Sequence, residues 1–124
     1  MGFIKEFVEI VGTKKGKNLQ ALFDSGAGRN YIRREFKSGE SVENIGYYYS
    51  EGIIFNPILA DGSKVKGEKV RFKEIKIYDF SVNDPEFIIM DNLIEDVIIG
   101  VFFMQNSSIS LDPPNEKIEI RNVK

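Results

Sequence analysis

The strongest structural signal in this sequence is an apolar segment that stops at a single carboxylate. Residues 21–27 read Ala-Leu-Phe-Asp-Ser-Gly-Ala. The apolar lead-in favours a buried strand, and Gly26 permits a tight turn that holds the carboxylate of Asp24 at the strand end. Asp-Ser-Gly is also common in ordinary turns, whereas a carboxylate fixed at a buried turn is a candidate for chemistry.

A second apolar segment near the end of the chain has a related form. Asp96 is followed by Val-Ile-Ile, then by Gly100, and residues 101–105 read Val-Phe-Phe-Met-Gln. This pattern predicts a short buried strand over 96–100, a break at the glycine and a short apolar helix after it. Taken alone, the segment is an ordinary core strand.

The composition removes several classes of chemistry. The chain of 124 residues contains neither histidine nor cysteine. This excludes serine–histidine and cysteine–histidine catalysis within the chain, together with zinc–thiolate sites and disulfides. Carboxylates, lysines, tyrosines and backbone groups remain for catalysis, and we expect no metal and no cofactor. The formal net charge of −2 at pH 7 gives no broad basic surface for nucleic acid.

Length and hydropathy favour a small cytoplasmic protein. The chain is long enough for one domain, which we place over residues 1–124, and small domains commonly gain stability by associating. Charges at Lys5 and Glu6 come too early for a signal peptide, and no apolar run reaches membrane-spanning length. We therefore expect a cytoplasmic location and no membrane partner.

Patterns of apolar and β-branched residues predict a mostly β chain. The irregular region 28–51 includes Tyr31, Ile32 and Phe36, which are expected on one face of a short helix, and three tyrosines at 47–49, which are expected to pack rather than to stack on a ligand. The expected strands are 3–11, 19–23, 52–60, 63–78, 87–90, 96–100, 108–111 and 117–121.

Taken in this order, the two apolar segments resemble the motifs of the retropepsin-like aspartic proteases. That family has an apolar-apolar-Asp-Thr/Ser-Gly-Ala motif near its start and an apolar-apolar-Gly strand before a helix near its end. The second motif matches Ile98, Ile99 and Gly100 here. The resemblance implies an all-β fold, a closed or partly open β-barrel with a flap hairpin and one short helix after Gly100. It also implies that the strand at 98–100 supports the loop of Asp24.

The resemblance further implies a flap, a hairpin between the two motifs that folds over bound peptide. Its tip corresponds to Ala60, Asp61, Gly62 and Ser63, where Asp-Gly is a strong hairpin turn. A plain connecting hairpin would have the same pattern. The last strand, 117–121, matches the segment that builds the intersubunit sheet in retroviral members, and an edge strand within one chain is equally compatible.

The mechanism that the resemblance implies needs two carboxylates that share one proton. The chain contains no second Asp-Thr/Ser-Gly motif after an apolar strand, so activity would require a homodimer with Asp24 from each copy. In that reading Ser25 holds the two loops together, Gly26 permits the turn, and Ala27 leaves room for substrate.

Two positions depart from the retroviral pattern. Many retroviral enzymes have an acidic residue soon after the alanine and an arginine after the apolar-apolar-Gly, and the two form an ion pair. Here residues 28–30 and 101–102 replace both, so the chain is more similar to the cellular or microbial branch. The leading hypothesis is a homodimeric aspartic endopeptidase acting on peptides or proteins. The alternatives are a catalytically silent dimerisation or peptide-binding module, and an all-β binding domain with an incidental Asp-Ser-Gly turn.

Overall fold

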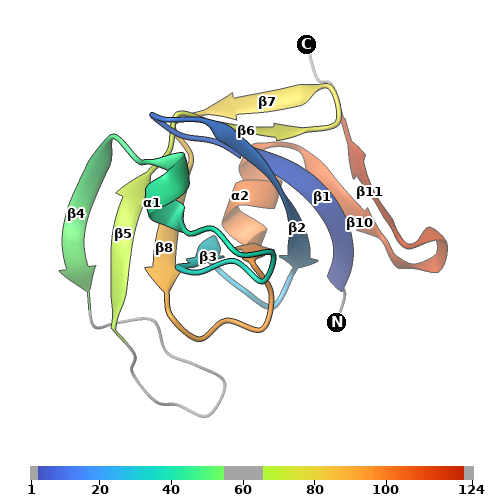
Figure 1. Ribbon diagram of the computed structural model, residues 1–124. Coiled ribbons are helices and arrows are strands. Elements are labelled where there is room, and N and C mark those ends of the chain that lie inside the picture. The colour runs from blue at the N-terminus through green and yellow to red at the C-terminus, as the bar shows by residue number, and fades with distance from the viewer. Residues whose placement is uncertain (1–2, 55–65, 122–124) are drawn as a thin grey trace.

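A single curved sheet forms most of the molecule in the computed structural model, which describes residues 3–54 and 66–121 (Figure 1). Nine strands pair in the order β4-β5-β8-β3-β9-β2-β1-β6-β7, and β10 and β11 form a separate two-stranded sheet. The sheet strands are β1 (Phe3–Val11), β2 (Gly16–Asp24), β3 (Tyr31–Arg33), β4 (Tyr49–Ile54), β5 (Gly67–Arg71), β6 (Glu74–Ile77), β7 (Phe80–Asn83), β8 (Glu86–Met90) and β9 (Val97–Ile99). The remaining elements are α1 (Val42–Ile45), α2 (Val101–Asn106), β10 (Ile109–Asp112), a 3₁₀ turn (Pro113–Asn115) and β11 (Lys117–Ile120).

The N-terminal hairpin carries the chain to the end of β2. β1 and β2 pair along their full length, from Phe3 opposite Asp24 to Val11 opposite Gly16. Alternate residues on each strand point to opposite faces, so Val8, Ile10 and Leu19 are buried while their neighbours face outward. The predicted strand at 19–23 therefore exists and begins three residues earlier than expected.

The central strands run in mixed directions. β2 is parallel to β9, with Phe23 beside Ile99, and β9 is antiparallel to β3, with Ile98 beside Tyr31. β3 is in turn parallel to β8. This arrangement places the end of β2 next to the end of β9, although about 75 residues of sequence separate them.

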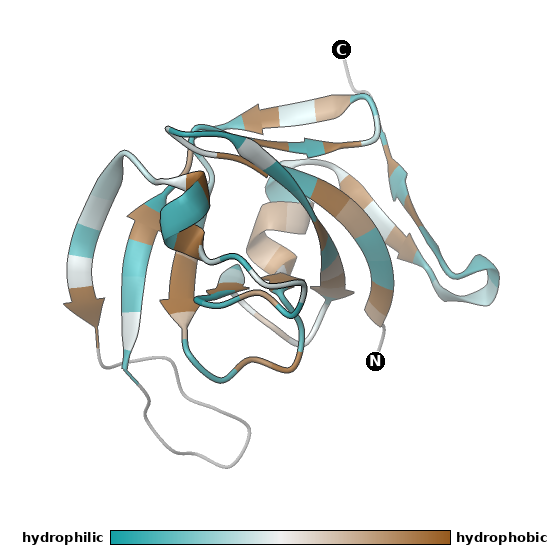
Figure 2. Ribbon diagram, viewed as in Figure 1, coloured by the Kyte–Doolittle hydropathy of each residue, from teal (hydrophilic) through white to brown (hydrophobic). Residues whose placement is uncertain are grey.

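The core lies on the concave side of the sheet. Phe23, Phe72 and Phe87 are fully buried there, and the rings of Phe72 and Phe87 meet edge to face at 5.6 Å. Tyr47 packs against the same core and contacts Phe72 edge to face, in agreement with a structural use of that tyrosine. Figure 2 shows hydrophobic residues concentrated on β8 and α2 and alternating with hydrophilic ones along β1.

A second, smaller apolar cluster lies on the other face. Its buried members are Ile88, Met90 and Leu93, and Tyr31, Ile54 and Ile98 pack against it. β4 and β7 are the two ends of the strand order, so the sheet is not closed within the described residues. The prediction of an all-β fold, a closed or partly open barrel with one short helix after Gly100, is confirmed, and the barrel is of the partly open kind.

Two local predictions were wrong, and one strand was missed. Residues 31–33 form β3 rather than a helix, because Ile32 pairs with both β8 and β9 and the gain from those neighbours outweighs the local helical spacing. The helical turn comes later, at α1, where Ser41 and Asn44 form a capping box. The long strand predicted over 63–78 is broken after Arg71, since β6 leaves β5 to pair with β1. β7 was not predicted.

Candidate active site

Asp24 occupies the end of β2 and is followed by a tight turn. Its carboxylate Oδ1 accepts a hydrogen bond from the backbone N–H of Gly26 at 2.8 Å, and its carbonyl accepts one from Ala27 at 3.1 Å. Asp24 is half-buried, while Ser25 and Gly26 are exposed. The turn expected at residues 24–27 is therefore formed, with the carboxylate fixed at the surface end of a buried strand.

The start of α2 is bound to the loop that follows Asp24. Val101 donates its backbone N–H to the carbonyl of Ala27 at 2.7 Å, and Phe102 donates to the carbonyl of Gly28 at 3.3 Å. Since Ile98 and Ile99 already lie beside β2, the structure brings the two segments singled out by the sequence into direct contact.

Gly100 is the closest point of that contact. A Cβ atom at this position would lie 2.4 Å from the carbonyl oxygen of Arg29 and 2.8 Å from its backbone carbon and nitrogen. All three are backbone atoms, so a side chain cannot be accommodated without displacing the loop. The glycine allows the strand to turn into α2 against the Asp24 loop.

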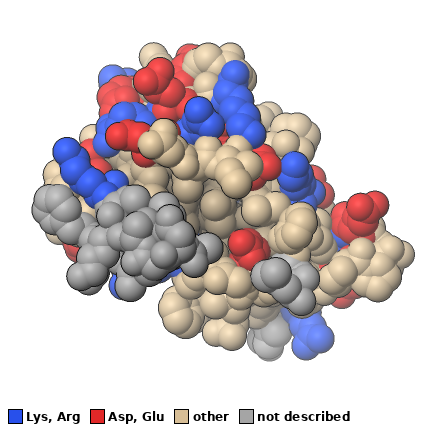
Figure 3. All heavy atoms as spheres, turned by 90° about the horizontal axis from the view of Figure 1, so that it is seen from below, with Lys and Arg blue, Asp and Glu red and all other residues tan. Residues whose placement is uncertain are grey.

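The face that carries the Asp24 side chain is largely apolar. Leu22 shares this face because it lies two residues before Asp24, and the register continues the row through Ile98 to Tyr31. Burial is the main cause that raises the pKa of the Tyr31 hydroxyl, and nearby Arg29 opposes the shift. Figure 3, viewed from the side where β2 ends, shows a mostly uncharged centre with charged side chains gathered toward the edges.

Comparison with known proteins agrees with this geometry. The aspartyl protease family model matches residues 10–103, which contain both motifs and more than half of the chain. The chain belongs to the aspartyl protease family. Among curated protein sequences, none matches it.

A solved structure supports the retropepsin-like fold of this aspartyl protease family member. The crystal structure of the retroviral protease-like domain of Ddi1 from Leishmania major is similar, with a TM-score of 0.63. The alignment covers 99% of this chain and 91% of that chain, at 14% sequence identity. At that identity, the likeness concerns the fold.

Several residues around the Asp24 loop were not predicted from the sequence. Leu22 could have been found, because it precedes Asp24 by two residues within a predicted strand. Tyr31 was assigned to a helix, and Asn30 has no signal in the sequence, since its partners come from distant segments. Glu86 also lies near the loop and contacts the cations Arg29, Lys69 and Arg71 at 3.8, 3.5 and 3.6 Å.

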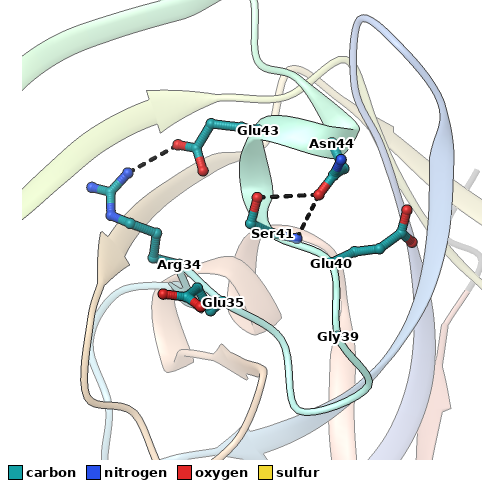
Figure 4. Close-up of a pocket in the computed structure, with 7 residues that line it drawn as sticks. All are labelled: Arg34, Glu35, Gly39, Glu40, Ser41, Glu43 and Asn44. Atoms are coloured by element: carbon teal, nitrogen blue, oxygen red, sulfur yellow. Dashed lines mark hydrogen bonds and ion pairs between the residues drawn. The ribbon is translucent and has the colours of Figure 1, made fainter.

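A separate surface pocket lies at the start of α1 and does not include Asp24. Figure 4 shows its polar lining, in which Ser41 and Asn44 hydrogen-bond to each other and Arg34 pairs with Glu43 at 3.0 Å. The lining residues are Arg34, Glu35, Gly39, Glu40, Ser41, Glu43 and Asn44. These contacts connect surface segments, and we assign no chemistry to them.

The expected flap tip at Ala60, Asp61, Gly62 and Ser63 lies outside the described residues. The two strands that lead to it are present, since β4 and β5 pair antiparallel with Ile54 opposite Gly67. In the part of the chain that the structure describes, no cluster of three or more carboxylate side chains is arranged to hold a metal ion. Over the same residues, no helix has the length and apolarity to cross a membrane.

Proposed function

We propose that this chain is an aspartic endopeptidase that acts as a homodimer, with one Asp24 from each copy in a shared site. The observation that carries the proposal is the carboxylate of Asp24, held by the Gly26 N–H at the end of β2. Membership of the aspartyl protease family supports it. Because the sequence has a single such motif, the second carboxylate comes from a second copy across a two-fold axis.

The two carboxylates hold one water molecule and share one proton. The ionised carboxylate takes a proton from the water as it attacks the scissile carbonyl, and the protonated one gives its proton to the carbonyl oxygen. Collapse of the tetrahedral intermediate transfers a proton to the leaving amine and regenerates the pair. Since one proton must be retained between two close carboxylates, activity is expected from acid to neutral pH.

The neighbouring residues fit supporting roles in this scheme. Ser25 holds the two loops together across the axis, Gly26 permits the turn, and Ala27 leaves space for the substrate backbone. A peptide in extended form would lie along the apolar face formed by Leu22, Ile98 and Tyr31. The hairpin arm of β4 and β5 would close over it as a flap.

The decisive experiment compares cleavage of a mixed peptide library by the wild type and by Asp24→Asn, from pH 3 to pH 8. We expect cleavage by the wild type and none by the variant. Asp79→Asn changes an exposed carboxylate in the turn after β6 and is the matched control. Cleavage that survives in Asp24→Asn would contradict the aspartic mechanism, as would a rate that rises steadily into alkaline pH.

Mixing the two proteins tests the shared site directly. With random pairing, an equal amount of Asp24→Asn added to the wild type lowers activity to about half, because mixed dimers carry only one native carboxylate. Unchanged activity at concentrations where chains exchange would contradict the two-copy site. Absence of cleavage by a stable wild-type dimer would instead support a silent dimerisation or peptide-binding module.

A further inference from the structure

Asn30 is a buried polar residue between the Asp24 loop and β3. Only 7% of its surface is exposed. It follows Asp24 by six residues and directly precedes Tyr31, the first residue of β3. A buried amide is costly unless its donor and acceptor are both satisfied, so its partners indicate what the side chain holds together.

The side chain and backbone of Asn30 join three segments. The side-chain Oδ1 accepts a hydrogen bond from the backbone N–H of Gly100 at 2.9 Å, and Nδ2 donates to the carbonyl of Glu86 at 3.3 Å. The backbone carbonyl of Asn30 accepts from Ile88 at 2.9 Å. One residue therefore ties the Asp24 loop to β8 and to Gly100, the residue just before α2.

These contacts act on the candidate site through Gly100. Its neighbour Val101 binds the carbonyl of Ala27, and Gly100 itself packs against the backbone of Arg29. Movement of Gly100 would therefore move both ends of the loop from Ala27 to Arg29. The bond between Asn30 and Gly100 is buried, where a hydrogen bond is stronger and its loss costs more than at the surface.

We propose that Asn30 is a positioning residue whose neutral amide holds the Asp24 loop against β8 and the start of α2. The inference rests on the proposed function for what the loop does, while the bonding itself is independent of activity. The acidic–arginine ion pair expected in many retroviral enzymes is missing here, at residues 28–30 and 101–102. Such an ion pair weakens at acid pH, because its carboxylate is protonated. The amide of Asn30 does not titrate, so its hydrogen bonds hold the loop unchanged at acid pH.

The variant Asn30→Asp is expected to make the hydrogen bonds of residue 30 depend on pH. A protonated aspartic acid has one acceptor and one donor, so it can keep both side-chain bonds of Asn30. An ionised aspartate has acceptors only, and one of its oxygens then faces the carbonyl of Glu86. The charged groups around the site are Arg29, Lys69 and Glu86, and the chain has no histidine to titrate near neutral pH.

The direction of the effect follows from linkage. In the unfolded variant, the introduced carboxyl group would titrate near the ordinary aspartate value of about 3.9. In the folded variant, burial and the Glu86 carbonyl favour the protonated form. Arg29 and Lys69 oppose this, but both already pair with the Glu86 carboxylate, so we expect the pKa of the introduced carboxyl group to be raised. Stability close to that of the wild type is expected below pH 4 and is lost as the pH rises, by about tenfold in the folding constant for each unit of pKa elevation.

The test measures denaturant unfolding and the exchange protection of the Gly100 amide at pH 4 and pH 7. We expect Asn30→Asp to match the wild type at pH 4 and to lose about tenfold or more of Gly100 protection at pH 7. Asn106→Asp changes an exposed residue that lines one surface pocket together with Asn30 and should show no such pH dependence. Asn30→Ala, which lacks both bonds, should lose protection at both pH values.

Each alternative outcome has a definite meaning. Wild-type protection of Gly100 at pH 7 in Asn30→Asp, or an equal loss at pH 4 and pH 7, would overturn the hydrogen-bonded role. In cleavage assays, we expect kcat of Asn30→Asp to fall on the order of tenfold to a hundredfold between pH 4 and pH 7 relative to the wild type, with a smaller change in KM. Loss of Gly100 protection with unchanged kcat would overturn the positioning of Asp24. A wild type without cleavage would contradict the proposed function and leave the exchange result standing.

Discussion

Phe3 lies directly opposite Asp24 in the antiparallel pair of β1 and β2. Residues that face each other in this way share a face of the sheet, with Cβ atoms about 4.5–5.5 Å apart. Phe3 is also 59% exposed, so a large aromatic side chain lies beside the candidate carboxylate. We therefore expect a second copy that brings its Asp24 close to this one to cover Phe3 as well.

Substitution Phe3→Ser is therefore expected to weaken the proposed dimer. Aromatic residues near the centre of an interface commonly account for a large share of the binding free energy, so we expect the dissociation constant to rise by about tenfold or more. Sedimentation at several protein concentrations measures the change. Phe7→Ser is the matched control, because Phe7 is 62% exposed on the same face but lies opposite Gln20. Equal effects of the two substitutions would contradict an interface centred on Asp24.

Gly100→Ala is expected to destabilise the fold more than Gly28→Ala. The new Cβ at position 100 would collide with backbone atoms of Arg29, whereas at position 28 it would meet only the ring of Phe102, at 3.3 Å. Phe102 is 61% exposed, so its ring can move aside. We expect a loss of about 2 kcal/mol or more for Gly100→Ala and less than about 1 kcal/mol for Gly28→Ala. Denaturant unfolding of the two variants measures the difference, and equal losses would show that the contact with Arg29 is not tight.

The sequence predicts those parts of the fold that depend on local pattern. Alternating apolar residues predicted the hairpin of β1 and β2, and the glycine after Ile99 predicted the change from strand to α2. The family motifs added that residues 24–27 lie beside 98–100, which periodicity alone does not contain. Local and family information together therefore predicted the turn at Asp24 and the segment that lies beside it.

The remaining features depend on neighbours that are distant in the sequence. Ile32 belongs to a strand because β8 and β9 provide partners on both sides, and no window around residue 32 contains that information. Asn30 can hold the Asp24 loop in place only because Glu86 and Gly100 lie within hydrogen-bond distance of its amide. The break after Arg71 follows in the same way from the pairing of β6 with β1.

Lys5→Met is expected to lower the free energy of unfolding, because it removes the closest cation of the buried Glu95 carboxylate. Glu95 is 7% exposed, and its closest cation is Lys5 at 3.1 Å, with Lys37 at 3.8 Å. Removing Lys5 leaves Glu95 with the more distant lysine, so we expect a loss of about 1–2 kcal/mol in unfolding free energy. The control Lys76→Met removes an ion pair of 4.0 Å with a partner that is 38% exposed, which should cost less than about 0.5 kcal/mol. Equal losses would show that burial of Glu95 does not decide the effect.

Glu40→Gln is expected to reduce stability only above the acid range. Hydrogen bonds from two lysines, with Lys15 having the larger effect and Lys17 the smaller, lower the pKa of Glu40 from its ordinary value of 4.5 to about 2. The Lys17 ammonium lies 2.8 Å from the Glu40 carboxylate. A lowered pKa stabilises the folded state above pH 4.5, and this contribution is lost as the pH falls toward 2.

The midpoint of thermal unfolding measures this effect. The difference between the wild type and Glu40→Gln should be largest above about pH 5, shrink as the pH falls from 4.5 to 2, and fall in salt of about 1 M, because the pair is at the surface. Glu35→Gln, an exposed glutamate on the same pocket wall, controls for the loss of one negative charge. A difference that stays constant down to about pH 2 would show that the effect does not come from the ionised carboxylate that the two lysines are expected to hold.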